Sequence, residues 1–171
     1  SQDHGGDLRA HASRRHAGLT MTADVVASRL ASAGLQLPAP AAAVGAYVPA
    51  VRAGDLVFTS GQLPVRGSEL LGIGVVPADV EPDHATACAA QCALNALAAA
   101  STVCDLDAVV RVVKLVGYVA SGPDFGGQPA VINGASEVMR IAFGDAGAHA
   151  REAVGVAALP LGAPVEVSLV L

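Results

Sequence analysis

The chain has 171 residues, which suits one domain with or without a short tail, and 53% of them are apolar, enough for a sizeable core. Its formal net charge is −5, which argues against a nucleic-acid partner, because phosphate binding is driven by clustered Lys and Arg. No run of roughly eighteen or more apolar residues is present, so we expect no membrane partner.

The first twenty residues are polar and mixed in charge, and they lack the apolar core of a signal peptide. A stretch with helical character follows, from Thr22 to Ala33, with apolar residues on one side. We therefore expect residues 1–20 to be a dispensable tail foreign to the native protein, and residues 21–171 to form a single domain.

Extended chain is predicted next, because the prolines of LPAPAAAVGAY break any helix. The segments AYVPAV and LVFTSGQLPV then read as the two strands of a β-hairpin, with Gly54 and Asp55 in its turn. Gly61 ends or bulges the second strand. The segment RGSELLGIGVVPAD that follows reads as a loop with at most a short strand.

The longest predicted helix runs from Pro82 to about Val103. Pro82 and Asp83 suit the first turn of a helix, and most of the residues that follow are Ala, Leu and Cys, so most of the helix circumference can be buried. One narrow polar stripe remains at helical spacing, formed by His84, Gln91, Asn95 and Thr102.

A second amphipathic helix is predicted from Pro129 to about Phe143, and glycines follow its end. Its apolar face carries Val, Ala and Met side chains. Its polar face is formed by Asn133, Ser136, Glu137 and Arg140.

The remaining strands are rich in Val. The stretch Ala108–Ala120 is apolar on both alternations, which predicts a central strand buried on both faces. The stretch His149–Leu171 reads as two strands joined by a tight Pro/Gly turn. It looks like core, yet Arg151 opens its first strand and Glu166 lies inside its second.

The order of elements, β-β-(β)-α-β-α-β-β, predicts an α+β fold in which a mixed β-sheet carries two helices on one face. Two helices can cover only one face of the sheet, whereas two of the strands are apolar on nearly all positions. We therefore expect the chain to self-associate through the second face.

Three cysteines are present, Cys88, Cys92 and Cys104, and they do not form a zinc-site pattern with histidine. An odd count in a chain of this size does not suggest a disulfide framework. Buried free thiols in a reducing cytosol are the simplest interpretation, so we expect a cytoplasmic protein.

Three ordered motifs between residues 45 and 171 resemble the RidA/YjgF family, also called the reactive-intermediate deaminase or L-PSP endoribonuclease-like family. They are GAYVPAVRAGDLVFTSGQLPV, DFGGQPAVINGASEVM and AREAVGVAALPLGAPVEVSLVL, and together they resemble a longer subgroup of the family. The resemblance implies a chorismate-mutase-like α+β fold and a homotrimer whose sheets form a barrel, with pockets between subunits.

The resemblance also assigns the two charged residues of the last stretch. The family's carboxylate-binding arginine lies just before a small and apolar strand, and Arg151 matches it. The family's acidic residue in the final strand matches Glu166, which would hold a water for attack on an imine carbon. From the residues alone, Arg151 could instead form a structural ion pair with Glu166 or Glu152, and Glu166 could form a salt bridge at the trimer interface.

Four further positions match the family's pocket: Tyr47, Ser60, Gly61 and Asn133. Each also has a purely structural interpretation, as an interface aromatic, an ordinary turn or part of a polar helix face. Two positions depart from the family pattern. Typical members carry Cys and Glu where this chain has Ala153 and Gly155.

Two functions of different classes follow. The first is hydrolytic deamination, in which a reactive 2-imine or 2-enamine acid becomes a 2-keto acid and ammonia, with Arg151 holding its carboxylate. We expect this reaction to need no metal or other cofactor, because its substrate is already electrophilic. The second is a binding protein for a small carboxylate-bearing metabolite, without turnover. An endoribonuclease is a third idea from the family, against which the acidic charge weighs.

Overall fold

The computed structural model describes residues 24–42 and 45–171, so the expected N-terminal tail lies outside the described residues. The order of elements along the chain follows the prediction, with short 3-10 turns between them. The helices are α1 (Val25–Ser32), α2 (Pro82–Ala100) and α3 (Gln128–Phe143). The strands are β1 (Ala50–Ala53), β2 (Leu56–Thr59), β3 (Val65–Arg66), β4 (Glu69–Leu70), β5 (Lys114–Ala120), β6 (Ala150–Val156) and β7 (Val165–Val170).

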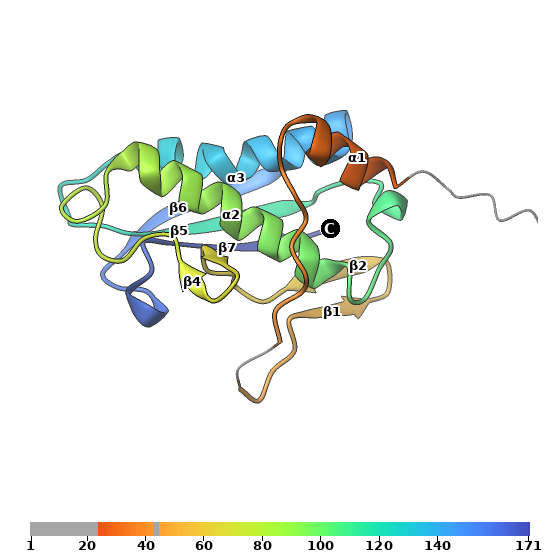
Figure 1. Ribbon diagram of the computed structural model, residues 1–171, viewed down its shortest axis with the longest axis horizontal. Helices are drawn as coiled ribbons and strands as arrows, with labels where there is room; N and C mark the ends of the chain where they lie inside the picture. The colour runs from red at the N-terminus through yellow and green to blue at the C-terminus, as the bar shows by residue number, and fades with distance from the viewer. Residues whose placement is uncertain (1–23, 43–44) are drawn as a thin grey trace, which may run out of the picture.

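Five strands form a mixed sheet in the order β1-β2-β7-β5-β6, and β3 and β4 form a separate small hairpin. Only β5 and β6 are parallel; the other neighbours are antiparallel. Helices α2 and α3 lie side by side on one face of this sheet, and α1 packs beside α3 (Figure 1). The predicted α+β fold with a mixed sheet is therefore confirmed, and α1 adds a third helix.

The last two strands do not form the hairpin that their tight turn suggests. Strand β5 lies between them, pairing in parallel with β6 and antiparallel with β7. The reason is that β5, α3 and β6 make a crossover unit, and such a unit places its second strand parallel to the first. The turn between β6 and β7, Pro160–Gly162, then carries the chain past β5 rather than back along β6.

The prediction that Ala108–Ala120 is a strand is wrong for its first residues, and within one chain only one face of the strand is fully buried. Strand β5 begins only at Lys114, and the residues before it start with a short 3-10 turn, Leu106–Ala108. Along β5, burial alternates, with Leu115 and Val119 fully buried and Val116 and Tyr118 half-buried. The helices cover one face of the sheet, and no described segment of the chain covers the other.

The two main helices approach each other closely because α3 carries a glycine at their contact. A side chain at Gly134 would overlap the backbone carbonyl of Thr86 in α2. Helix α1 is attached from its N-terminal end, where the Asp107 carboxylate accepts hydrogen bonds from the backbone N–H groups of Val25 and Val26, both at 2.9 Å. The core therefore joins three helices and one sheet face.

The cysteines are free, with Cys88 and Cys92 buried and Cys104 half-buried, and burial raises the pKa of each thiol. Among the described residues, no helix combines the length and the apolar character needed to cross a membrane.

Candidate functional site

Arg151 lies at the start of the edge strand β6, on the face of the sheet that the helices cover. Its register partner is Leu115, and its guanidinium extends over α3. There Nη1 donates hydrogen bonds to Asn133 Oδ1 at 2.7 Å and to Ser136 Oγ at 3.2 Å. The side chain is exposed, and its Nε and Nη2 groups make no hydrogen bond to any described residue.

The alternative that Arg151 forms a structural ion pair does not hold within the described part of the chain. Glu152 points to the opposite face of β6 and forms its salt bridge with Lys114, at 2.5 Å. Glu166 lies on β7, whose neighbour is β5 and not β6. Arg151 is thus held by two neutral oxygen atoms rather than by an anion.

Two residues of this cluster, Ser136 and His149, were not predicted as site residues. Ser136 Oγ lies 3.0 Å from His149 Nε2, and His149 Nδ1 lies 2.6 Å from the carbonyl oxygen of Gly147. Both side chains are half-buried and line an open hollow of about 600 Å³ at the end of α3. The only sign in the sequence that these two residues belong to the site is their spacing. Ser136 lies one helical turn after Asn133, and His149 lies two residues before Arg151.

Glu166 lies on the other face of the sheet. Its neighbours along β7, Val165 and Val167, are fully buried beneath the helices, so the alternation of the strand turns Glu166 away from them. The carboxylate is half-buried, and this burial raises its pKa. A side chain at Gly61 would overlap the Glu166 carboxylate, so the absence of one lets the carboxylate lie directly against the backbone.

The N-terminal site residues gather near Glu166 rather than near Arg151. Tyr47 and Gly61 line a hollow of about 440 Å³, and Tyr47 is exposed. The Ser60 hydroxyl donates to the carbonyl oxygen of Val48 at 2.7 Å, which fixes the chain between β2 and Gly61. The structure thus brings the predicted residues together in two groups, one around Arg151 and one around Glu166.

The departure from the family pattern at Gly155 has a visible consequence. A side chain there would come within 2.8 Å of both the Gln128 amide nitrogen and the Ser121 hydroxyl. That amide donates to Ser121 Oγ at 3.1 Å and to the carbonyl oxygen of Phe125 at 2.6 Å. Typical members carry a glutamate at the position of Gly155. In this chain the position has no side chain, and the amide of Gln128, the first residue of α3, lies against it.

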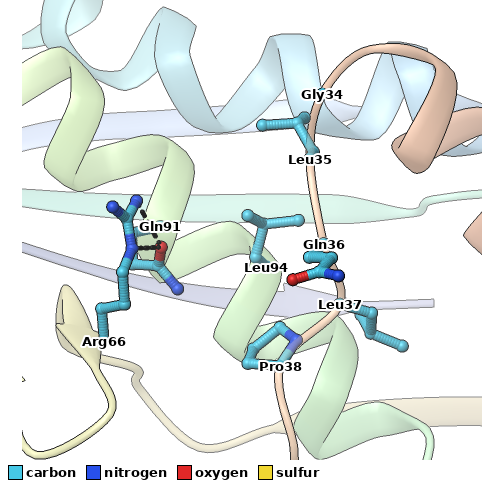
Figure 2. Close-up of a pocket in the computed structure, with 8 residues that line it drawn as sticks. All are labelled: Gly34, Leu35, Gln36, Leu37, Pro38, Arg66, Gln91 and Leu94. Atoms are coloured by element: carbon cyan, nitrogen blue, oxygen red, sulfur yellow. Dashed lines mark hydrogen bonds between the residues drawn. The ribbon is translucent and has the colours of Figure 1, made fainter.

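A separate hollow of about 380 Å³ lies between α2 and the extended segment 34–38 (Figure 2). Arg66 donates from Nε and Nη2 to Gln91 Oε1, at 3.2 and 3.1 Å. Gln91 in turn donates to Asn95, whose amide nitrogen donates to the carbonyl oxygens of Leu63 and Val65, both at 2.9 Å. The polar stripe of α2 therefore holds the chain around β3 in place, and none of the predicted site residues lines this hollow.

Comparison with known proteins identifies the family. The model of the family described as "YjgF/chorismate mutase-like, putative endoribonuclease" matches residues 27–170. The chain belongs to the YjgF family. This match spans every helix and strand of the structure except the first two residues of α1, so the three motifs and the fold agree with each other.

Proteins from several organisms are similar to this chain. Protein TCP17 of Trypanosoma cruzi is 43% identical over 144 residues, which cover 83% of this chain and 90% of that protein. The structure of the Agrobacterium tumefaciens protein Atu1372, described as having unknown function, is 42% identical, with a TM-score of 0.78 over 86% of this chain and 92% of that one. A Shewanella oneidensis structure named "putative endoribonuclease" is 33% identical, with a TM-score of 0.82 over 85% and 97%.

Proposed function

We propose that this YjgF-family protein hydrolyses reactive 2-imino or 2-enamino acids to 2-keto acids and ammonia, and that Arg151 binds the substrate carboxylate. The observation that carries the proposal is the hydrogen bonding of the Arg151 guanidinium. Among the described residues, two neutral acceptors bind it, both through Nη1, and the exposed side chain keeps its Nε and Nη2 groups available for a ligand. That edge of a guanidinium is a fork that matches the two oxygens of a carboxylate.

A family member with a bound amino acid supports the ligand class. The Escherichia coli protein TdcF, described with bound serine, is 30% identical, with a TM-score of 0.52 over 77% of this chain and 91% of that one. Serine carries the carboxylate beside a nitrogen-bearing carbon that a 2-imino acid also has. We carry this likeness over to the present chain as part of the proposal.

The reaction requires a water and a group that moves protons. Water adds to the imine carbon, the carbon–nitrogen bond breaks, and the products are a 2-keto acid and ammonia. Glu166 suits the proton transfers, because its raised pKa brings it nearer to neutral pH than an ordinary glutamate. It accepts a proton from the attacking water and passes it to the nitrogen. The proton of the added hydroxyl follows the same route as the carbon–nitrogen bond breaks, so the carbonyl forms and ammonia leaves.

Within one chain, Arg151 and Glu166 cannot act on the same small molecule. They lie on opposite faces of the sheet, and β5 separates their strands. Arg151 is level with Leu169, three residues along β7 from Glu166, so the two backbones are about 10 Å apart across the strands and about 10 Å apart along them. The proposed site therefore combines Arg151 of one copy with Glu166, Tyr47 and the Ser60–Gly61 turn of another. We propose that a homotrimer brings them together, with Arg151 at the edge strand β6 of one copy lying beside the open sheet face of the next.

The test is a set of arginine variants measured for ammonia release from enzymatically generated imino acids. Arg151→Ala should lower activity and 2-keto acid affinity by about 10–100-fold, because a charged hydrogen bond is worth roughly 1.5–3 kcal/mol. Arg151→Lys should restore little, since an ammonium is not a planar fork. Arg140→Ala is the matched control, because Arg140 lies on the same side of α3 but pairs with Glu137.

Full activity in Arg151→Ala would contradict the proposal, as would a wild-type protein that neither releases ammonia nor binds 2-keto acids. Binding without turnover would instead support the second candidate, a carboxylate-binding protein. The observation that favours this candidate is Gly155, which has no carboxylate and against which the Gln128 amide lies. Specific RNA cleavage that Arg151→Ala leaves unchanged would indicate the endoribonuclease for which the family is named.

A further inference from the structure

Ser136 and His149 connect Arg151 to the backbone of the turn that precedes β6. Their hydrogen bonds run from Arg151 Nη1 to Ser136 Oγ, from there to His149 Nε2, and from His149 Nδ1 to the carbonyl oxygen of Gly147. The three distances are 3.2, 3.0 and 2.6 Å. None of the acidic residues in the described part of the chain forms a salt bridge with His149.

When the His149 imidazole is neutral, the carbonyl acceptor at one end of this series of hydrogen bonds determines which atom donates in each of them. A carbonyl oxygen only accepts, so His149 Nδ1 carries the hydrogen that it donates to Gly147. In a neutral imidazole the other nitrogen, Nε2, is then an acceptor, and the Ser136 hydroxyl donates to it. The lone pairs of Ser136 Oγ are left to accept the N–H group of Arg151.

The end of this series of hydrogen bonds at Gly147 is held in place by close packing. Gly147 is buried, and a side chain there would overlap the backbone carbonyl of Met139 in α3, so the turn lies tightly against the helix. His149 is thus anchored to a carbonyl group that packs against α3, and Ser136 lies in α3 as well. Because the hydroxyl donates to an imidazole nitrogen, its oxygen becomes a stronger acceptor for the guanidinium.

We propose that His149 is a positioning residue that acts through Ser136 to orient the Arg151 guanidinium for carboxylate binding; this rests on the proposed function. Asn133 and Ser136 lie one turn apart on α3 and both accept from Nη1. Two acceptors on a single nitrogen fix the plane of the guanidinium, and its opposite edge is then presented to the ligand before binding. This lowers the conformational entropy that a flexible arginine loses when it binds.

Two substitutions at residue 149 separate this role from a merely structural one. His149→Gln places an oxygen acceptor near the position of Nε2 and keeps the bond from Ser136. His149→Asn places an amide donor near the position of Nδ1, and keeps only the bond to Gly147. If His149 served only to hold the turn, the Asn variant would be the functional one.

The first readout is calorimetric affinity for pyruvate, a simple 2-keto acid. We expect a loss of about 3–10-fold in His149→Asn and Ser136→Ala, the size of a neutral hydrogen bond, and less than about 2-fold in His149→Gln. The double variant His149→Asn/Ser136→Ala should be no weaker than either single one, because both break the same chain. Ser101→Ala is the control, since the Ser101 hydroxyl bonds only the carbonyl of Ala98 in the helix α2.

The second readout does not depend on any ligand. In nitrogen NMR spectra, wild-type His149 should show a protonated Nδ1 and an unprotonated Nε2, and Arg151 should show separate, slowly exchanging Nη signals. Those Arg151 signals should merge in His149→Asn and Ser136→Ala. If the wild type neither releases ammonia nor binds pyruvate or other 2-keto acids, the proposed function fails, while the NMR signals still decide the positioning role. Unchanged Arg151 signals in Ser136→Ala, or an Asn variant that binds better than the Gln variant, would overturn the inference.

Discussion

At the scale of the residue, Glu166 shows how burial and function conflict. The carboxylate lies half-buried against the backbone at Gly61, and none of the described cations forms a salt bridge with it. Burial disfavours the charged form and raises the pKa. The folded state therefore binds a proton more tightly than the unfolded chain does, and ionisation of Glu166 costs stability above its folded pKa.

Glu166→Gln removes this cost and should raise the free energy of unfolding at pH 7–8. The difference from the wild type should shrink as the pH falls through the raised pKa towards the ordinary range of a glutamate, because the wild-type carboxyl is then protonated as well. Thermal unfolding of both proteins from pH 4 to pH 8 measures this. Glu152→Gln, whose exposed carboxylate pairs with Lys114, should show no such gain. A less stable Glu166→Gln at pH 8 would contradict this, because it would show that a cation of another copy, such as Arg151, pairs directly with the carboxylate rather than lying across a bound substrate from it.

At the scale of the element, glycines set how closely the helices pack. Gly134 lies inside α3, where glycine costs about 1 kcal/mol relative to alanine in helix propensity. Its presence is explained by Thr86, whose carbonyl in α2 occupies the space of a side chain. A similar contact joins α3 to the sheet, since a side chain at Gly117 in β5 would overlap Ile132. Both contacts hold α3 in the position from which Asn133 and Ser136 reach Arg151.

Gly134→Ala should destabilise the protein despite its better helix propensity. The added methyl group meets a backbone carbonyl, which cannot rotate away, so α2 and α3 must separate, and we expect a loss of about 1–3 kcal/mol in the free energy of unfolding. Chemical denaturation measures the loss. Gly122→Ala is the matched control, because no atom lies within 4 Å of the added group there, and it should be close to neutral. Equal stability of the two variants would show that the helices do not meet as described.

At the scale of the whole molecule, the sheet has one face beneath the helices and one that the described chain leaves open (Figure 1). Large apolar side chains on the open face remain accessible, with Val51 at 51%, Phe58 at 39% and Val154 at 45% of their full exposure. They belong to strands at both ends of the sheet, so the apolar surface spans its full width. A surface of this kind favours association with other copies.

The wild-type protein should therefore sediment as a trimer at micromolar concentration. Phe58→Asp and Val154→Asp each place a charge on the open face, and we expect both to shift the protein towards monomer and to remove the proposed activity, since the site needs two copies. Val110→Asp is the control, because Val110 is 88% exposed and lies outside the sheet. Circular dichroism verifies that the variants stay folded. A monomeric wild type, or a trimer that survives both substitutions, would contradict this assembly.

Local patterns were enough to predict most elements of this protein. The first hairpin followed from Gly54 and Asp55, the starts of α2 and α3 followed from Pro82 and Pro129 to within one residue, and the end of α3 followed from the glycine after Phe143. Helix α2 ends at Ala100, before the predicted Val103. Helices and tight turns are decided by residues a few positions apart, so the sequence alone determines them. The family also followed from the motifs, whereas the roles of Arg151, Glu166 and the other site residues remain predictions.

The pairing of strands and the faces of the site were decided only by the tertiary structure. The sequence places β6 and β7 in succession, but the crossover through α3 puts β5 between them. Alternation along a strand assigns Arg151 and Glu166 to one side or the other, yet it does not say which side the helices cover. Likewise, Ser136 and His149 meet only because α3 packs against the start of β6. Contacts between distant segments depend on the packing of the whole core, which no local pattern encodes.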